Sequence, residues 1–257
     1  MPTTYVARDF EAYSTTHLVA LAVFLVGVVV IVAVGRRHRD QDVAVPFSRG
    51  FALAICVFTV PLQVLQLLPA DWNPRTSLPF QLCDLAWMGA VYALWTHRDW
   101  AVGLTYFWGL TLTTQGIITP ALDQDWPSPR YVMFWGMHLL IVWAAIYLVW
   151  GLRLTPTWAV YRKAVAITTT WAVAVFTYNA IAGTNYGYLN RKPSTASILD
   201  YLGPWPLYVV LEIAIVVAAW ALLTWPWSRA RSRDARSTTG EGPRVWAAGQ
   251  RSRQTPS

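Results

Sequence analysis

Charge is the property that this sequence has least of. Only 13% of its 257 residues are Asp, Glu, Lys or Arg, whereas a soluble domain usually has about 25%. The shortage comes from seven apolar runs of 18 to 21 residues, in which Asp84 and Glu212 are the only charged residues. The runs are 18–35, 51–69, 79–96, 101–121, 131–151, 164–184 and 207–227. Each is long enough to cross a hydrocarbon core about 30 Å thick. The sequence therefore predicts an all-α, polytopic membrane bundle of seven transmembrane helices and excludes a soluble enzyme.

Other scarcities exclude further classes of protein. Lys163 and Lys192 are the only lysines and both lie outside the runs, so no span offers a lysine for a retinal Schiff base. The two cysteines, Cys56 and Cys83, cannot build a disulfide framework. No pair of histidines has metal-ligand spacing, and no Gly-rich nucleotide motif is present. No internal repeat is visible, which argues against an inverted-repeat transporter. We therefore expect neither a metal nor a cofactor.

The loop charges predict an orientation in the membrane. Lys and Arg in alternate segments sum to 5 on one side and 15 on the other, the side that includes 36–50 and the tail after 227. Because positive residues stay on the cytoplasmic side, we expect the N-terminus outside and the C-terminus in the cytoplasm. The net charge of +7 then needs no nucleic acid partner. We expect residues 1–227 to form the transmembrane domain and 228–257 a disordered basic tail, in a multi-pass protein of the plasma membrane.

Polar side chains inside the spans gather near one surface of the predicted bundle. Such side chains cost free energy in a bilayer unless they meet partners, water or a substrate. With this orientation they lie within roughly 10 Å of the outer interface, at 1.5 Å per residue. They are Gln66, Gln81, Cys83, Asp84, Gln115, His138, Asn179 and Glu212. The cytoplasmic halves contain no Asp, Glu, Asn, Gln or His. The pattern predicts a polar cavity open toward the outer leaflet, and it lacks the groups at all depths that an ion pathway needs.

Cys83 and His138 are the two residues of this cluster that are able to do covalent chemistry. A thiolate attacks esters and holds an acyl group as a thioester, and a neutral imidazole is able to take the thiol proton. His138 is the only histidine within a run. The alternative is structural, since a free cysteine is commonly a small buried core residue and a lone histidine is usually hydrogen-bonded in a core.

The two carboxyl groups within the runs, those of Asp84 and Glu212, also have a functional and a structural interpretation. Asp84 follows Cys83 directly, so the two side chains point about 100° apart on a helix. We expect Asp84 to pair with another helix, through Asn179 or Gln115, or to orient His138. Glu212 has the same ambiguity, and interhelical hydrogen bonding is the structural alternative for both carboxyl groups.

Five segments resemble the YwaF family of integral membrane proteins. They are Leu-Pro-Phe-Gln-Leu-Cys-Asp (78–84), Thr-Pro-Ala-Leu (119–122), Phe-Trp-Gly-Met-His (134–138), Gly-Thr-Asn-Tyr-Gly-Tyr-Leu-Asn-Arg-Lys-Pro (183–193) and Leu-Asp-Tyr-Leu-Gly-Pro-Trp-Pro-Leu-Tyr (199–208). The last two are the most specific, and the resemblance extends from the second run to the seventh. This family looks related to the vertebrate transmembrane-protein-164 family, a cysteine-dependent acyltransferase family that makes polyunsaturated ether phospholipids. The relationship implies a nucleophile at Cys83 and a base at His138. Family members often have His where this chain has Gln81, so a second imidazole is absent here.

Two hypotheses of function follow. In the first, the protein is a membrane-embedded O-acyltransferase that acts on phospholipids through an acyl-thioester on Cys83, or a related hydrolase if water reaches the thioester. Gln81, Asn179 or Asn185 would stabilise the oxyanion, and Tyr186 completes the substrate-binding or structural polar cluster. In the second, the same cavity belongs to a non-enzymatic binder of lipids or small molecules, a transporter subunit or receptor. That hypothesis predicts that Cys83 and His138 lie too far apart to share a proton. Membrane lipids are the expected partners in both.

Overall fold

A computed structural model describes residues 8–69, 72–120, 122–193 and 197–240, and within these ranges the chain is helical without a β-strand. The prediction of an all-α protein is therefore confirmed. Five helices are long and apolar enough to cross a membrane within the described ranges. They are α1 (Thr15–His38), α2 (Ala44–Leu67), α6 (Pro129–Ile146) with its extension η2 (Tyr147–Gly151), α7 (Trp158–Ala182) and α8 (Leu207–Gly240).

The other two predicted spans form shorter helical segments of the same bundle. The run 79–96 becomes α3 (Leu82–Thr96), which begins after Gln81 because the Asp84 carboxylate accepts the Gln81 backbone N–H at 3.1 Å and caps the helix there. The run 101–121 becomes α4 (Asp99–Trp108), a π-helical stretch η1 (Gly109–Thr113) and α5 (Thr114–Ile118). Neither α3 nor any single part of the second segment has the length that a spanning helix usually needs.

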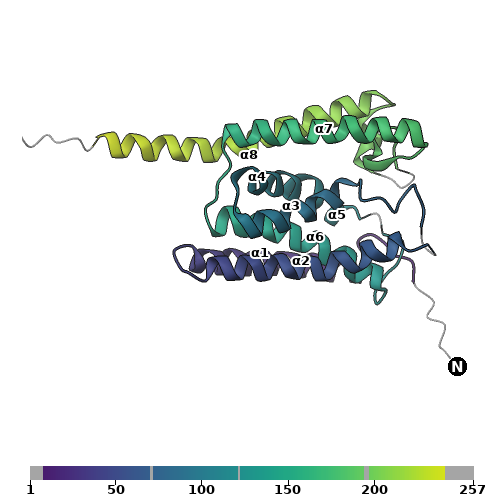
Figure 1. Cartoon of the computed structure of the whole chain (residues 1–257), viewed down its shortest axis with the longest axis horizontal. Helices are drawn as coiled ribbons and strands as arrows, with labels where there is room; N and C mark the ends of the chain where they lie inside the picture. Colours follow the sequence, from purple (N-terminus) through teal and green to yellow (C-terminus); the bar gives the residue numbers. More distant parts are fainter. Residues whose placement is uncertain (1–7, 70–71, 121, 194–196, 241–257) are drawn as a thin grey trace, which may run out of the picture.

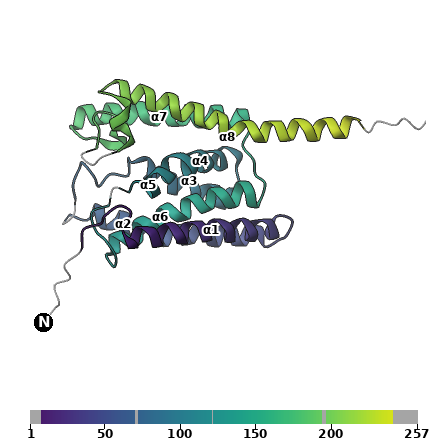
Figure 2. The ribbon, with the colours of Figure 1, turned by 180° about the vertical axis from the view of Figure 1, so that it is seen from behind.

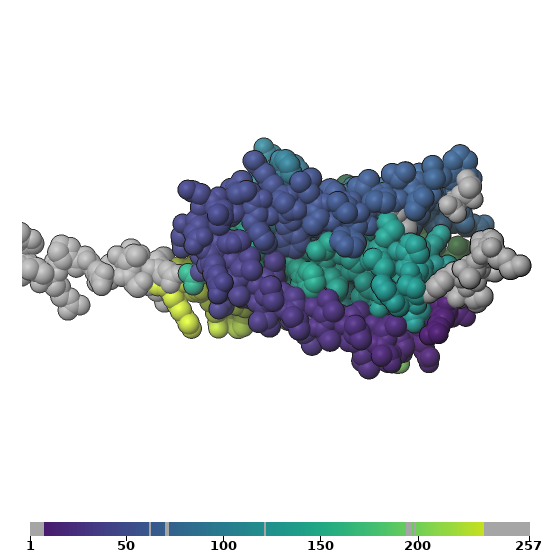
Figure 3. Space-filling view, turned by 90° about the horizontal axis from the view of Figure 1, so that it is seen from below, coloured from purple at the N-terminus to yellow at the C-terminus, as the bar shows by residue number. Residues whose placement is uncertain are grey.

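The helices lie in layers (Figure 1 and, from behind, Figure 2). Helices α7 and α8 form one layer, α3 to α5 lie in the middle, and α1, α2 and α6 form the opposite side. Seen from below in Figure 3, α1 and α2 cover that side, and α6, which contacts both, is visible between them. Helix α4 is central, since every residue from Ala101 to Trp108 is buried.

A close crossing of glycines holds α1 against the end of α6. A Cβ on Gly35 would lie 2.5 Å from Gly151 Cα, so only glycines allow the two backbones to come this close. Beside the crossing, the Arg39 guanidinium donates hydrogen bonds to the carbonyls of Trp150 and Gly151 at 2.8 to 3.1 Å. The contact satisfies the last carbonyls of a helix that has no further turn to accept them.

Helix α8 continues beyond the predicted span. Residues 228–240, which we expected to be disordered, extend α8 to Gly240, while 241–257 lie outside the described residues. The extension has a local cause, because residues 228–239 contain neither glycine nor proline. Arg231 also ties it to the α6–α7 connection by donating to Thr155 Oγ1 at 2.7 Å and Pro156 O at 2.8 Å.

Candidate functional site

A cavity of about 1420 Å³ is lined by residues of the α7–α8 layer on one side and of the rest of the bundle on the other, together with Phe10 and Tyr13 from the segment before α1. It receives side chains from α2, α3, α5, α6, α7, α8 and the connection between α7 and α8. Seven residues of the predicted polar cluster line it, namely Gln66, Gln81, Cys83, Asp84, Gln115, His138 and Glu212. Aromatic and aliphatic side chains such as Phe58, Trp87, Phe134, Phe176 and Trp220 form much of the remaining lining. The cavity therefore combines a long apolar volume with a few polar groups, as lipid and small-molecule sites do.

Cys83 reaches the cavity from the first turn of α3, where it is the second helical residue. Backbone N–H groups in this turn have no acceptor within the helix. The neighbouring carboxyl group of Asp84 is used at the start of its own helix. Asp84 accepts from the Gln81 backbone, whereas Asn179 bonds to other groups, so the expected pairing of Asp84 with Asn179 is not present.

His138 lies on α6, where one of its ring nitrogens makes a hydrogen bond and the other has no partner among the described residues. Its Nδ1 lies 2.8 Å from the carbonyl oxygen of Phe134. Because a carbonyl only accepts hydrogen bonds, Nδ1 carries the proton and Nε2 keeps its lone pair. The Phe134 ring packs against the imidazole, with the centroids 4.1 Å apart and the ring planes tilted by 31°. Within the described ranges, Nε2 has no hydrogen-bond partner, and no hydrogen bond joins it to Cys83 Sγ.

The start of α3 is also where the α7–α8 connection is anchored. Gln81 Oε1 accepts the backbone N–H of Gly187 at 2.9 Å. The Tyr186 hydroxyl donates to Pro74 O at 2.8 Å and accepts the Leu78 N–H at 3.1 Å. Gly187 has φ +65°, and a Cβ there would lie 2.7 Å from the Trp171 ring, so the close approach requires glycine. Gln81 therefore positions the loop as well as lining the cavity.

Three predicted cluster residues do not line the cavity but shape this connection. Asn179 Oδ1 accepts from Thr184 Oγ1 at 2.7 Å and from the Tyr186 N–H at 2.9 Å, and its Nδ2 donates to Tyr186 O at 2.9 Å. Asn185 Oδ1 accepts the N–H groups of residues 190 and 191, and its Nδ2 donates to the carbonyl of residue 191. Tyr186 itself is fully buried. Their polar atoms are thus occupied by the fold.

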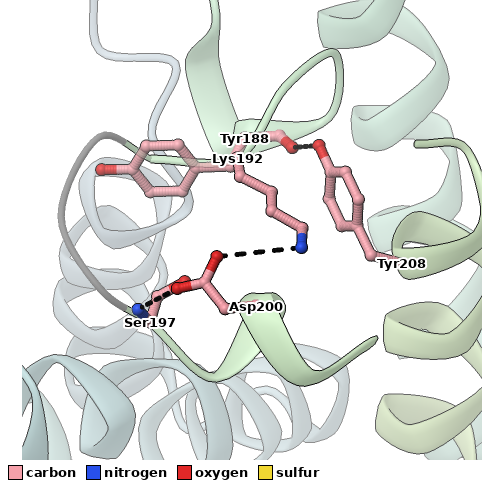
Figure 4. A network of polar contacts seen from close by, with 5 residues as sticks. All are labelled: Tyr188, Lys192, Ser197, Asp200 and Tyr208. Carbon is pink, nitrogen blue, oxygen red and sulfur yellow. Dashed lines mark hydrogen bonds and ion pairs between the residues drawn. The ribbon is translucent and has the colours of Figure 1, made fainter. Parts of the chain in front are cut away.

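The rest of the connection is folded by a small polar network (Figure 4). Lys192 Nζ lies 3.7 Å from Asp200 Oδ1, and Asp200 Oδ2 accepts the Ser197 N–H at 2.8 Å. The Tyr208 hydroxyl at the start of α8 donates to Tyr188 O. These bonds bring Tyr188 and Ser197 into the cavity lining. Residues of the connection therefore form part of the cavity wall.

The structure adds residues that sequence reasoning did not select. Gly116 packs against the His138 ring, and nothing in a lone glycine of an apolar run signals that position. Arg130 lines the cavity from the first turn of α6, although in the sequence it counts only as a loop charge. Tyr188 lies inside the segment 183–193, so the resemblance pointed to its neighbourhood but not to the residue.

No group of three or more His, Cys, Asp or Glu side chains able to hold a metal ion occurs in the part of the chain that the structure describes. The cavity lining offers a thiol, an imidazole, three carboxyl groups, a guanidinium and several amides among largely apolar side chains.

Comparison with known proteins agrees with this picture of an apolar helical protein. No curated protein and no solved structure matches the chain. The model of the TMEM164 family matches residues 12–224, from before α1 to the middle of α8. The matched range includes all the residues from α2 onward that line the cavity. The chain, an integral membrane protein with several spans, belongs to the TMEM164 family.

Proposed function

We propose that this protein is a membrane-embedded, cysteine-dependent O-acyltransferase that acts on phospholipids, with Cys83 as nucleophile and His138 as base. The observation that carries the proposal is that one cavity of about 1420 Å³ is lined by both the thiol and an imidazole whose Nε2 is unprotonated and unpartnered among the described residues. The apolar lining suits acyl chains, and membership of the TMEM164 family supports a membrane setting.

The proposed reaction has two transfers. His138 Nε2 takes the proton from the Cys83 thiol, and the thiolate attacks the ester carbonyl of a phospholipid. The ester C–O bond breaks, the leaving alkoxide takes the proton from His138, and the acyl group stays on sulfur as a thioester. A lysolipid hydroxyl then loses its proton to Nε2 and attacks the thioester. The C–S bond breaks, and the proton returns to the thiolate.

Stabilisation of the tetrahedral oxyanion is assigned to the start of α3. The N–H groups of Leu82 and Cys83 belong to the first turn, where no intrahelical acceptor exists and the helix dipole is positive. The Gln81 side chain uses its oxygen for Gly187 and keeps its NH₂ group available. Donors of this kind, aimed at a developing oxyanion, typically contribute about 10²- to 10³-fold in rate.

We further propose seven spans in the plasma membrane, with α3 and the α4–α5 segment as the two short ones. The N-terminus lies outside and the C-terminus in the cytoplasm, as the excess of 15 over 5 basic residues favours. The cavity then faces the outer leaflet, just beneath the headgroups, where the ester carbonyls of phospholipids lie.

The test is acyl transfer in proteoliposomes with a phospholipid donor and a labelled lysophospholipid acceptor. We expect Cys83→Ala to lose about 10³-fold or more of the transfer rate, because the covalent route is removed. Cys56→Ala is the matched control, since Cys56 lies on α2 and does not line the cavity. A labelled acyl group should remain on the wild-type protein and be released by hydroxylamine. Full transfer by Cys83→Ala would overturn the proposal.

A non-enzymatic lipid or small-molecule binder is the second candidate. It is favoured by one observation, that no hydrogen bond joins Cys83 and His138 within the described ranges. In that case a lipid would bind in the cavity without turnover, and both Cys83→Ala and wild type would retain the same amount of intact phospholipid.

A further inference from the structure

A second, smaller cavity of about 230 Å³ adjoins the large one beside the start of α6. Its polar side chains are Gln66, Gln124, Ser128 and Arg130. Because Gln66, Gln124 and Arg130 line both spaces, the small cavity is a side recess of the large one. We call it the side recess. It therefore offers a separate polar compartment beside the apolar volume that contains Cys83 and His138.

Arg130 brings an uncompensated positive charge to the side recess. Within the described part of the chain, the one ion pair is that of Lys192 with Asp200, so the Arg130 guanidinium has no carboxylate partner there. Only its backbone N–H is engaged, as donor to Ser128 Oγ at 3.2 Å. A guanidinium presents five N–H donors in a planar fork that matches the oxygens of a phosphate.

The side-chain amides of Gln66 and Gln124 in the side recess have NH₂ groups available to donate hydrogen bonds. Gln124 Oε1 accepts the Ser128 hydroxyl at 2.6 Å, which leaves the Gln124 NH₂ group available. The Gln66 side chain has no hydrogen-bond partner among the described residues. The acidic neighbour Asp123 lines the large cavity but not the side recess. One cation with amide donors and no carboxylate is the donor set of an anion site rather than a cation site.

The position of the side recess relative to the thiol and imidazole matches the shape of a phospholipid. Arg130 and His138 lie on the same helix eight residues apart, about 12 Å along its axis at 1.5 Å per residue. A glycerophospholipid carries its phosphate on one terminal carbon of glycerol and its two acyl esters on the other two carbons, so the acyl chains extend away from the phosphate. A phosphate at Arg130 therefore directs the esters and acyl chains into the large cavity.

We propose that the side recess is a headgroup subsite in which Arg130 binds the phosphodiester of a glycerophospholipid. This inference deepens the proposed function by naming the group that selects phospholipids over uncharged glycerolipids. Its argument rests on Arg130 and the two amides, and so it can be tested separately from the chemistry at Cys83.

The experiment measures binding of full-length protein carrying Cys83→Ala, in neutral detergent, by native mass spectrometry. The probes are dioleoylphosphatidylcholine, dioleoylglycerol and inorganic phosphate. We expect the phospholipid to bind about tenfold more tightly than the diacylglycerol, as a charge-assisted hydrogen-bond pair typically allows. Arg130→Gln should remove this preference and leave diacylglycerol binding unchanged. Arg75→Gln is the control, because Arg75 is exposed, as Arg130 is, but lines neither space.

Arg130→Lys keeps the positive charge but lacks the planar guanidinium, so it should retain part of the preference for phospholipid over diacylglycerol. This second variant shows whether a loss in Arg130→Gln comes from the missing charge or from a folding defect. Equal binding of phospholipid and diacylglycerol by the parent protein would overturn the inference, as would a preference that survives Arg130→Gln. Inorganic phosphate that binds as tightly as the phospholipid would show a free-anion site and overturn the lipid assignment.

Failure of this inference and failure of the proposed function are distinguishable. Loss of acyl transfer in Cys83→Ala with an unchanged preference in Arg130→Gln contradicts the headgroup subsite alone. Full acyl transfer by Cys83→Ala with a lost preference in Arg130→Gln contradicts the acyltransferase and retains the subsite.

Discussion

Gly116 on α5 lies directly against the imidazole of His138 on α6. A Cβ built at Gly116 would come within 3.0 Å of both Cδ2 and Nε2 of that ring. Since Nδ1 is held by the Phe134 carbonyl at 2.8 Å, the shift of a few tenths of an ångström that a Cβ would impose on the ring also strains this hydrogen bond. The absence of a side chain at Gly116 thus sets the position of the nitrogen that we assign as the base.

The first prediction concerns this contact. Gly116→Ala should displace the His138 ring and lower the acyl-transfer rate by about 10- to 100-fold, the loss expected when a reacting group is misplaced by a fraction of an ångström to one ångström. Gly50→Ala is the matched control, because a Cβ there has nothing within 4 Å. The transfer rate and the thermal unfolding midpoint are measured for both. Equal rates for the two variants would contradict the assignment of His138.

The second prediction is the removal of the base itself. His138→Gln should reduce acyl transfer by about 10²- to 10⁴-fold, the usual contribution of a positioned general base. His97→Asn is the comparison, because His97 caps the opposite end of α3 with φ +51°, which asparagine tolerates, and its Nε2 bonds to Ser48 Oγ at 3.0 Å. The measured quantity is the first-turnover rate of thioester formation. Unaltered thioester formation in His138→Gln would assign deprotonation to another group.

The third prediction separates a structural role from a role in binding. Asn179→Ala removes three buried hydrogen bonds at the end of α7 and should lower the free energy of unfolding by about 2–4 kcal/mol. Asn179→Asp keeps the acceptor for Thr184 and Tyr186 but turns a carboxyl oxygen toward the buried Tyr186 carbonyl, so its cost should be at least as large. Unfolding in mixed micelles measures both. A drop in transfer rate without a drop in stability would mean that Asn179 meets the substrate after all.

The fourth prediction tests how the α7–α8 connection is anchored. Gln81→Ala removes the acceptor of the Gly187 N–H and should cost about 1 kcal/mol, visible as faster hydrogen exchange of that amide. Gln81→Glu retains an acceptor oxygen and should protect the amide as the wild type does. If exchange at Gly187 is the same in Gln81→Ala and wild type, the loop is held by Tyr186 rather than by Gln81.

The helices follow from the sequence because hydropathy is a strong and additive signal. Five of the seven apolar runs became helices of membrane-spanning length, with ends within a few residues of the expected ones at α1 and α6. The run 79–96 lost its first residues because Gln81 and Asp84 cap the helix, a side-chain contact that hydropathy does not measure. The π-helical stretch in 101–121 has the same kind of cause, since the Thr114 hydroxyl bonds to the Gly109 carbonyl five residues back.

The sequence indicates which polar residues lie together, but not which of them line the cavity and which bond to the neighbouring loop. The cost of burying polar groups singles out the polar residues within apolar runs, and two of these, Gln115 and Glu212, line the cavity. The same argument selected Asn179, whose polar atoms are instead consumed by the adjacent loop. Depth along a helix is readable from sequence, whereas the direction around its axis depends on tertiary packing. Arg130 was missed for the converse reason, because a charge at the end of a run already has an explanation in orientation.

The π-helical stretch η1 accommodates one extra residue just before the residues of α5 that face the site. Its turn contains one residue more than an α-helical turn, and one residue corresponds to about 100° of rotation. After Thr114, the next two residues of α5 are Gln115 and Gly116. Deleting one residue between Gly109 and Thr113 would therefore restore a regular α-helical turn and leave Gln115 facing the cavity and Gly116 facing His138, whereas the same deletion in α4 would rotate both by about 100°. In this segment the angular phase of the helix, as much as the identity of its residues, is what a functional relative must preserve.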